Sequence, residues 1–141
     1  MVYKPLPYYT INEIRQIINT GIIEDIRILP LSVGEYVENW KEAQDICIEF
    51  SVHKDEEVRA NAARGLGSIA RRMKKLEKNI VKPILLKLLD DCMEYDPIII
   101  AYIIEGIGDI NFFMKWNIGK NAMRKYESNL KKNYKVRQHS I

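Results

Sequence analysis

The 141-residue sequence has little of several residue types on which particular functions depend. It contains two cysteines and two histidines, and neither histidine has a cysteine or carboxylate at the spacing typical of metal ligands. A disulfide framework needs a denser cysteine pattern, so Cys47 and Cys92 are expected to be buried, reduced thiols. The composition therefore predicts no metal site, no cofactor and no disulfide scaffold.

Long apolar runs and strand patterns are also missing. The first residues contain no apolar stretch of the secretory type, and the longest uncharged apolar run, 97–104, is shorter than the ~20 residues that span a membrane. No alternating strand pattern, no glycine-rich loop after a strand and no catalytic triad can be identified. We expect one all-α domain over residues 1–141, without catalytic residues, in the cytoplasm and independent of membranes.

Charge is distributed unevenly along the chain, although the net charge is only +3. Residues 1–60 carry 6 Lys and Arg against 11 Asp and Glu, whereas residues 115–141 carry 8 against 1. Segments of opposite sign indicate either self-complementary docking or separate surfaces for partners.

Helical periodicity accounts for most of the sequence. Thr10 and Glu13 have the spacing of a capping box, and Gly21 is suited to end the helix that follows. A short second helix is expected from residue 22 until Pro30, which would end it. Apolar residues at three- and four-residue steps predict four more helices. These cover residues 35–52, 55–73, 77–93 and 96–114.

Two of the expected helices match each other about 41 residues apart. Residues 55–69 align with 96–110, which places Gly65 on Gly106 and Gly67 on Gly108. Glycine inside a helix costs ~1 kcal/mol relative to alanine, so paired glycines indicate close packing between helices. A period of ~40–47 residues is typical of a helical solenoid, here with units 35–73 and 77–114. The residues expected to contact between units are Asp55, Arg59, Gly65, Gly67, Asp96, Gly106 and Gly108.

The last predicted helix, 96–114, is apolar on nearly every side and must be covered. A capping helix within 117–137 is expected to supply that cover. Its apolar stripe would be Met123, Tyr126, Leu130 and Tyr134.

These residues together resemble the HEAT-repeat family, and in particular small bacterial HEAT-like immunity proteins of polymorphic or contact-dependent toxins. Residues 53–72, 109–116 and the opening Tyr8–Ile14 carry the resemblance, which spans 8–116. It implies an α-solenoid of antiparallel helical pairs, with about six to seven helices. It also implies a non-catalytic protein that binds and neutralises a cognate toxin domain.

One feature departs from the HEAT pattern. In these repeats an acid at the turn and an arginine four residues later tend to form a ladder between units. Asp55 and Arg59 match that pattern, but Ile100 stands at the position equivalent to Arg59. The ladder is therefore not expected to extend through the last unit.

Five acidic residues step by three and four positions and would form one stripe on the predicted helix 35–52. A stripe without interleaved lysines is either a solvated helix face or a contact surface for a basic protein, such as a nuclease toxin. The candidate partner-binding residues are Glu35, Glu38, Glu42, Asp45 and Glu49.

Two basic segments, 71–82 and 115–137, support an alternative function. They would make the protein a HEAT-like module that binds nucleic acid. Cations at the end of a helix are also favoured by the helix dipole, without any ligand. Segment 71–82 lacks interleaved aromatic residues, so we favour the toxin-binding interpretation.

Overall fold

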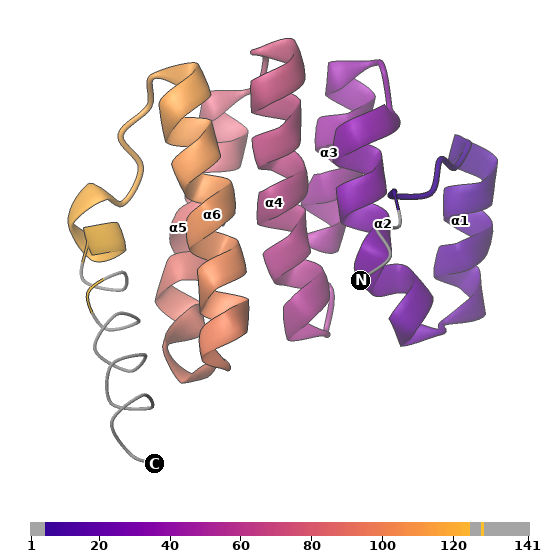
Figure 1. Cartoon of the computed structure of the whole chain (residues 1–141), viewed down its shortest axis with the longest axis horizontal. Helices are drawn as coiled ribbons and strands as arrows, with labels where there is room; N and C mark the ends of the chain where they lie inside the picture. The colour runs from indigo at the N-terminus through magenta and orange to yellow at the C-terminus, as the bar shows by residue number, and fades with distance from the viewer. Residues whose placement is uncertain (1–4, 125–127, 129–141) are drawn as a thin grey trace.

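The computed structural model describes residues 5–124 and 128, and within them it contains helices and no strand (Figure 1). The all-α fold predicted from the sequence is confirmed. The helices are α1 (Ile11–Thr20), α2 (Ile23–Tyr36), α3 (Trp40–Phe50), α4 (Glu56–Met73), α5 (Lys78–Asp91), the short 3-10 helix η1 (Cys92–Glu94) and α6 (Pro97–Met114).

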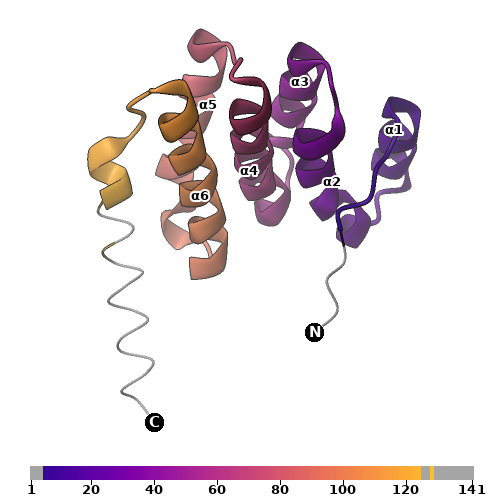
Figure 2. The ribbon, with the colours of Figure 1, turned by 45° about the horizontal axis from the view of Figure 1, so that its top comes forward.

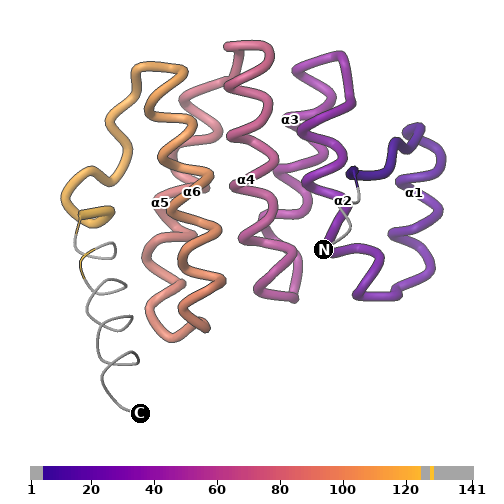
Figure 3. The backbone as a smooth tube through the Cα atoms, viewed as in Figure 1, coloured from indigo at the N-terminus to yellow at the C-terminus, as the bar shows by residue number. Residues whose placement is uncertain are grey.

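The helices lie in a row that is two layers deep. Helices α2, α4 and α6 form one layer, with α4 in contact with both neighbours, and α3 and α5 lie behind them (Figures 1 and 2). Helix α1 packs beside α2 at one end of the row. The chain path proceeds from α1 at that end to α6 at the other (Figure 3). Each helix therefore contacts mainly its immediate neighbours in the row.

Local signals set the ends of α1 as predicted. The Glu13 amide donates to Thr10 Oγ1 (3.2 Å), and the Thr10 amide donates to Glu13 Oε1 (3.0 Å), which completes the capping box. Gly21 ends the helix in the left-handed region at φ 69°. Helix α6 begins in a similar way, because Asp96 Oδ1 accepts a hydrogen bond from the Ile98 amide (3.0 Å).

The predicted helix 35–52 is wrong. Helix α2 continues through Pro30 to Tyr36, and α3 begins only at Trp40. Asn39 separates the two helices, because its side-chain oxygen accepts a hydrogen bond from the Glu42 amide (2.9 Å) and caps α3. Pro30 removes one hydrogen bond from α2, but it is buried. Tertiary packing thus keeps the chain helical where the local signal favours a stop.

Glycines allow the layer of α2, α4 and α6 to pack backbone against backbone. A Cβ atom on Gly34 would lie 2.6 Å from the Gly65 carbonyl oxygen, and one on Gly65 would lie 2.5 Å from the Pro30 carbonyl oxygen. A Cβ atom on Gly106 would lie 2.4 Å from the backbone of Ala63. No side chain fits at these three positions, so each requires glycine.

The second glycine of each pair faces the element that follows its helix along the row. A Cβ atom on Gly67 would lie 3.1 Å from the Gly106 carbonyl oxygen in α6. At Gly108 the nearest atom to such a Cβ is Met123 Cε, at 4.0 Å. Gly67 therefore lies in close contact with α6. Gly108 faces the segment after α6, and a Cβ atom would fit there.

The segment after α6 returns along that helix. Asn111 holds it at Ile118, accepting from the Ile118 amide (2.9 Å) and donating to the Ile118 carbonyl (3.0 Å). Residues 120–124 are helical, and Met123 is buried. The other members of the predicted capping stripe, Tyr126, Leu130 and Tyr134, lie outside the described residues.

Helix α6 is the most apolar element of the described chain. By length and composition alone it is apolar enough to cross a membrane. Its side chains Ile103, Ile107 and Ile110 are fully buried, as in the core helix of a packed domain.

An ion pair joins α2 to the start of α4. Arg27 Nε and Nη2 donate to the two carboxylate oxygens of Asp55 (3.0 and 3.1 Å), and Asn61 Nδ2 donates to the Arg27 carbonyl (2.8 Å). The hydrogen bonds from Arg27 hold the pKa of Asp55 below its usual range. Asp55 is therefore paired with an arginine of α2, the preceding helix of the layer.

The equivalent contact between α4 and α6 is not formed. Arg59 donates to the His53 carbonyl (2.7 Å) and to the Tyr95 hydroxyl (2.6 Å), and Asp96 caps its own helix. The ladder of acid–arginine pairs thus stops after the Arg27–Asp55 contact.

Both cysteines lie in the core, as expected. Burial raises the pKa of Cys47 to about 12, so this thiol stays protonated at neutral pH. Cys92 is buried at the end of α5, where its Sγ donates to the Leu89 carbonyl (3.1 Å).

We predict that Gly65→Ala destabilises the protein strongly, because the new Cβ would overlap the Pro30 carbonyl of α2. Overpacking of this kind costs about 1–3 kcal/mol. Gly108→Ala is the matched control, since its Cβ has space and alanine favours a helix by ~0.5–1 kcal/mol. Urea unfolding followed by circular dichroism measures both. Equal effects of the two substitutions would show that close backbone packing does not determine this fold.

We predict a pH-dependent contribution from the Arg27–Asp55 pair, which Asp55→Asn removes. Because the pKa of Asp55 is lowered by folding, its contribution is fully present above the ordinary aspartate pKa of about 3.9. It is lost as the pH falls through the lowered, folded-state value. The unaltered protein should be more stable than the variant at pH 7, and the difference should vanish in acid. A difference that stays constant between pH 7 and pH 2 would contradict this assignment.

Candidate partner-binding surface

The five predicted partner-binding acids do not lie on one helix. Glu35 belongs to α2, Glu38 to the connection between α2 and α3, and the other three to α3. The single stripe predicted for one continuous helix is therefore wrong. The five acids are divided between two helices and the connection that joins them. The reason is the Asn39 cap, which starts a new helix with its own direction between Tyr36 and Trp40.

Three of these acids are paired within the protein. Such pairs between exposed side chains contribute little to stability, but they reduce the charge that a carboxylate can offer to a partner. The pairs are Glu35 with Arg71, Asp45 with Lys41 and Glu49 with Arg15.

Glu38 and Glu42 differ from the other three. Both are exposed, and neither forms an ion pair or a side-chain hydrogen bond within the described part of the chain. They line a pocket of about 310 Å³, which we call the tyrosine pocket. Its lining residues are Tyr8, Tyr9, Thr10, Ile11, Tyr36, Val37, Glu38, Asn39 and Glu42.

The extended segment before α1 forms one wall of the tyrosine pocket. The Tyr36 hydroxyl donates to the Leu6 carbonyl (2.9 Å) and holds this segment beside the end of α2. The rings of Tyr8 and Tyr36 meet edge to face, with centroids 5.8 Å apart. Tyr8 remains 66% exposed, so an aromatic surface stands open next to two carboxylates.

This arrangement suits the binding of a cationic partner. Carboxylates attract lysine and arginine side chains, and exposed tyrosine rings bind the same cations through their faces. Tyrosine is also enriched at the energetic centres of protein interfaces. The sequence analysis did not identify the tyrosines, because the apolar spacing within residues 35–52 was interpreted as one continuous helix.

A second surface crosses the layer of α2, α4 and α6. It is a groove of about 350 Å³ that contains Glu35. Its charges are mostly neutralised internally, because Glu35 pairs with Arg71, and Glu105 pairs with Arg64 (3.3 Å). The groove therefore presents no single sign of charge to a partner.

Several cations of the basic segment 71–82 are also engaged internally. Arg71 pairs with Glu35, Arg72 Nη1 donates to the Gly34 carbonyl (2.5 Å), and the Lys78 ammonium lies 5.6 Å from the Trp116 ring centroid. Of the segment 115–137, only residues up to 124 and residue 128 are described. The contacts seen favour a structural role for these cations at the end of α4.

His53 has a local role. Its Nδ1 accepts a hydrogen bond from the Asp55 amide (3.1 Å) in the turn between α3 and α4. Across the described residues, no three His, Cys, Asp or Glu side chains gather in a position to hold a metal ion.

Comparison with known proteins finds similarity at the level of the fold. No protein-family model matches the sequence, and no curated protein matches it significantly. A chain in the crystal structure of a CDI complex from Cupriavidus taiwanensis LMG 19424 superposes with a TM-score of 0.65 and 21% sequence identity. The alignment covers 80% of this chain and 97% of that chain. The two chains therefore share a fold over nearly the whole length of the Cupriavidus protein.

Proposed function

We propose that this protein is a cytoplasmic immunity protein of a contact-dependent growth inhibition system, which neutralises a toxin domain by binding it without catalysis. The observation that carries the proposal is the fold shared with a chain of the Cupriavidus CDI complex. The resemblance of residues 8–116 to HEAT-like immunity proteins points the same way. The row of helices, in which each contacts mainly its neighbours, supports the HEAT-type solenoid that the resemblance implies.

Under this proposal the toxin binds at the tyrosine pocket. Glu38 and Glu42 can receive a cation without breaking an internal ion pair, unlike Glu35, Asp45 and Glu49. A toxin that acts on nucleic acid needs a basic surface to attract phosphate, and these carboxylates are complementary to such a surface.

The exposed charges and the aromatic surface would contribute to toxin binding in different ways. Exposed charges contribute only ~0.2–1 kcal/mol each, but they accelerate association through long-range attraction. A buried aromatic anchor contributes about 2 kcal/mol or more and slows dissociation. Glu38 and Glu42 should therefore set the association rate, and Tyr8 the lifetime of the complex.

The first test replaces both free acids, in Glu38→Lys/Glu42→Lys. Association with the cognate toxin domain should slow about tenfold or more at low salt, and it should become less sensitive to salt. Asp90→Lys/Glu94→Lys is the matched control, because it changes the same charge at exposed residues of α5 and η1. Surface plasmon resonance over a range of salt concentrations measures the rates, after circular dichroism has verified each fold.

The second test is Tyr8→Ala, which should increase the dissociation rate about thirtyfold or more while leaving association nearly unchanged. Unchanged rates in both tests would remove the tyrosine pocket as the contact surface. Failure of the unaltered protein to bind the toxin domain, together with retention on a DNA resin at moderate salt, would replace the proposed function by nucleic-acid binding.

A further inference from the structure

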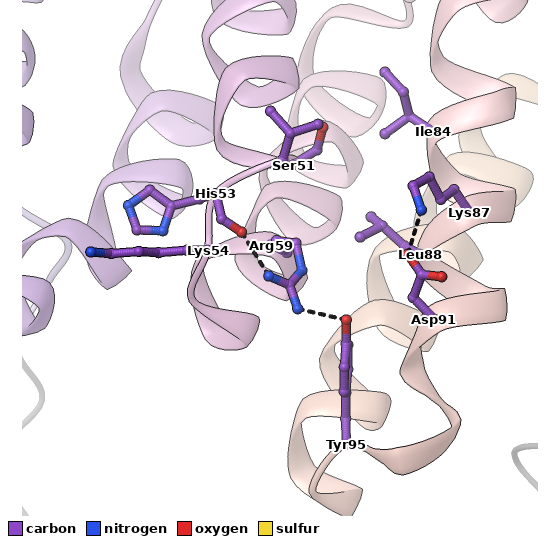
Figure 4. A pocket seen from close by; sticks show the side chains of 10 residues that line it. Ser51, His53, Lys54, Arg59, Ile84, Lys87, Leu88, Asp91 and Tyr95 are labelled. Carbon is purple, nitrogen blue, oxygen red and sulfur yellow. Dashed lines mark hydrogen bonds and ion pairs between the residues drawn. The ribbon is translucent and has the colours of Figure 1, made fainter.

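A second pocket, of about 330 Å³, lies between the α3–α4 turn and α5 (Figure 4). It shares no residue with the tyrosine pocket. One wall is apolar and consists of Ile84 and Leu88 of α5, with Val52 of the turn, which is 76% exposed. An exposed aliphatic side chain beside a concave apolar wall provides a surface that a partner can cover.

Arg59 lies at the centre of this pocket, with its guanidinium held in position (Figure 4). It donates to the His53 carbonyl (2.7 Å) and the Tyr95 hydroxyl (2.6 Å), and it lies 5.4 Å from the Tyr95 ring centroid. Both acceptors are neutral, and they use two of the five N–H donors of the guanidinium. Within the described chain Arg59 has no carboxylate partner, so its remaining donors are available.

Arg27, on the preceding helix of the layer, has the carboxylate partner that Arg59 lacks. Arg27 donates two hydrogen bonds to the carboxylate of Asp55. The acid equivalent to Asp55 is Asp96, which is turned to its own helix and accepts from the Ile98 amide. Arg59 is therefore held in position by neutral groups and has no bound carboxylate, whereas Arg27 binds one.

The other charges of the pocket reinforce its positive sign. Lys54 is exposed, and Lys87 pairs with Asp91 (2.8 Å). The hydrogen bond with Asp91 raises the pKa of Lys87, and the positive charge of Arg59 acts in the opposite direction. The lining of the pocket thus contains three cations and one carboxylate, and that carboxylate is already paired.

We propose that this pocket is a second binding site, which takes an acidic side chain of a protein partner that stands next to an apolar residue. The carboxylate accepts hydrogen bonds from the free donors of Arg59, and the apolar neighbour covers Ile84 and Val52. The planar guanidinium suits a carboxylate, with two parallel hydrogen bonds. Inorganic phosphate would gain nothing from the apolar wall, so a protein side chain is the better occupant.

This site goes beyond the proposed function, because it is a different surface with the opposite charge. Its test uses short peptides and the full chain, and it requires no toxin. The peptides are acetyl-leucyl-glutamyl-leucinamide and the glutaminyl analogue, which differ only in carboxylate against amide. The Arg59 Nε–H resonance in ¹H–¹⁵N spectra reports occupancy directly.

The glutamyl peptide should shift this resonance saturably, with a dissociation constant at least about tenfold lower than that of the glutaminyl peptide. Arg59→Gln should abolish the difference between the peptides, as followed through the amides of the pocket. Arg71→Gln is the matched control, because Arg71 lies on the same helix about 18 Å from Arg59. It should bind the glutamyl peptide as the unaltered protein does.

Three results would each overturn the proposal. The two peptides could bind the unaltered protein equally, which would reveal an apolar pocket without charge recognition. Arg59→Gln could retain the preference for the glutamyl peptide, or inorganic phosphate could shift the Arg59 resonance as strongly as that peptide. The comparison of the two peptides needs no variant, so it remains decisive even where Arg59→Gln unfolds.

Discussion

The close approach of three helix backbones is the constraint on which the rest of this structure depends. Gly34, Gly65 and Gly106 let α2, α4 and α6 pack where a single added Cβ atom would collide with a neighbouring backbone. Because Gly34 lies two residues before Tyr36, the same contact fixes the end of α2 and the connection to α3. The tyrosine pocket is built on that connection, so a packing requirement in the core determines where the exposed acids stand.

Local capping patterns and the repeated glycine pairs in the sequence were sufficient to predict much of the fold. The capping box at Thr10 and the glycine pairs of α4 and α6 predicted helices and their close packing. Pro30 was misinterpreted as a stop, because its burial against α4 depends on residues distant in sequence. The gap before α3 was also missed, since the three- and four-residue spacing of apolar side chains continues across it. Asn39, three residues before Glu42, carried the signal of a helix start.

The candidate site was less predictable than the fold. The acids were visible in the sequence, but their partners Arg15 and Arg71 lie more than thirty positions away from Glu49 and Glu35. Only the folded chain shows which carboxylates remain unpaired. Likewise, Tyr8 and Tyr36 form one aromatic surface because a hydroxyl in α2 binds the Leu6 carbonyl. Free charge and aromatic surface thus arise from tertiary contacts that no local pattern encodes.

Hydrogen exchange measured on the protein, alone and mixed with the toxin domain that the proposed function assigns to it, tests the central claim most directly. If the protein neutralises that toxin through the tyrosine pocket, backbone amides in 8–11 and 36–42 should exchange more slowly in the complex. The groove across α2, α4 and α6 should be unaffected. Protection confined to that groove, or exchange that the toxin domain leaves unchanged throughout, would contradict the account.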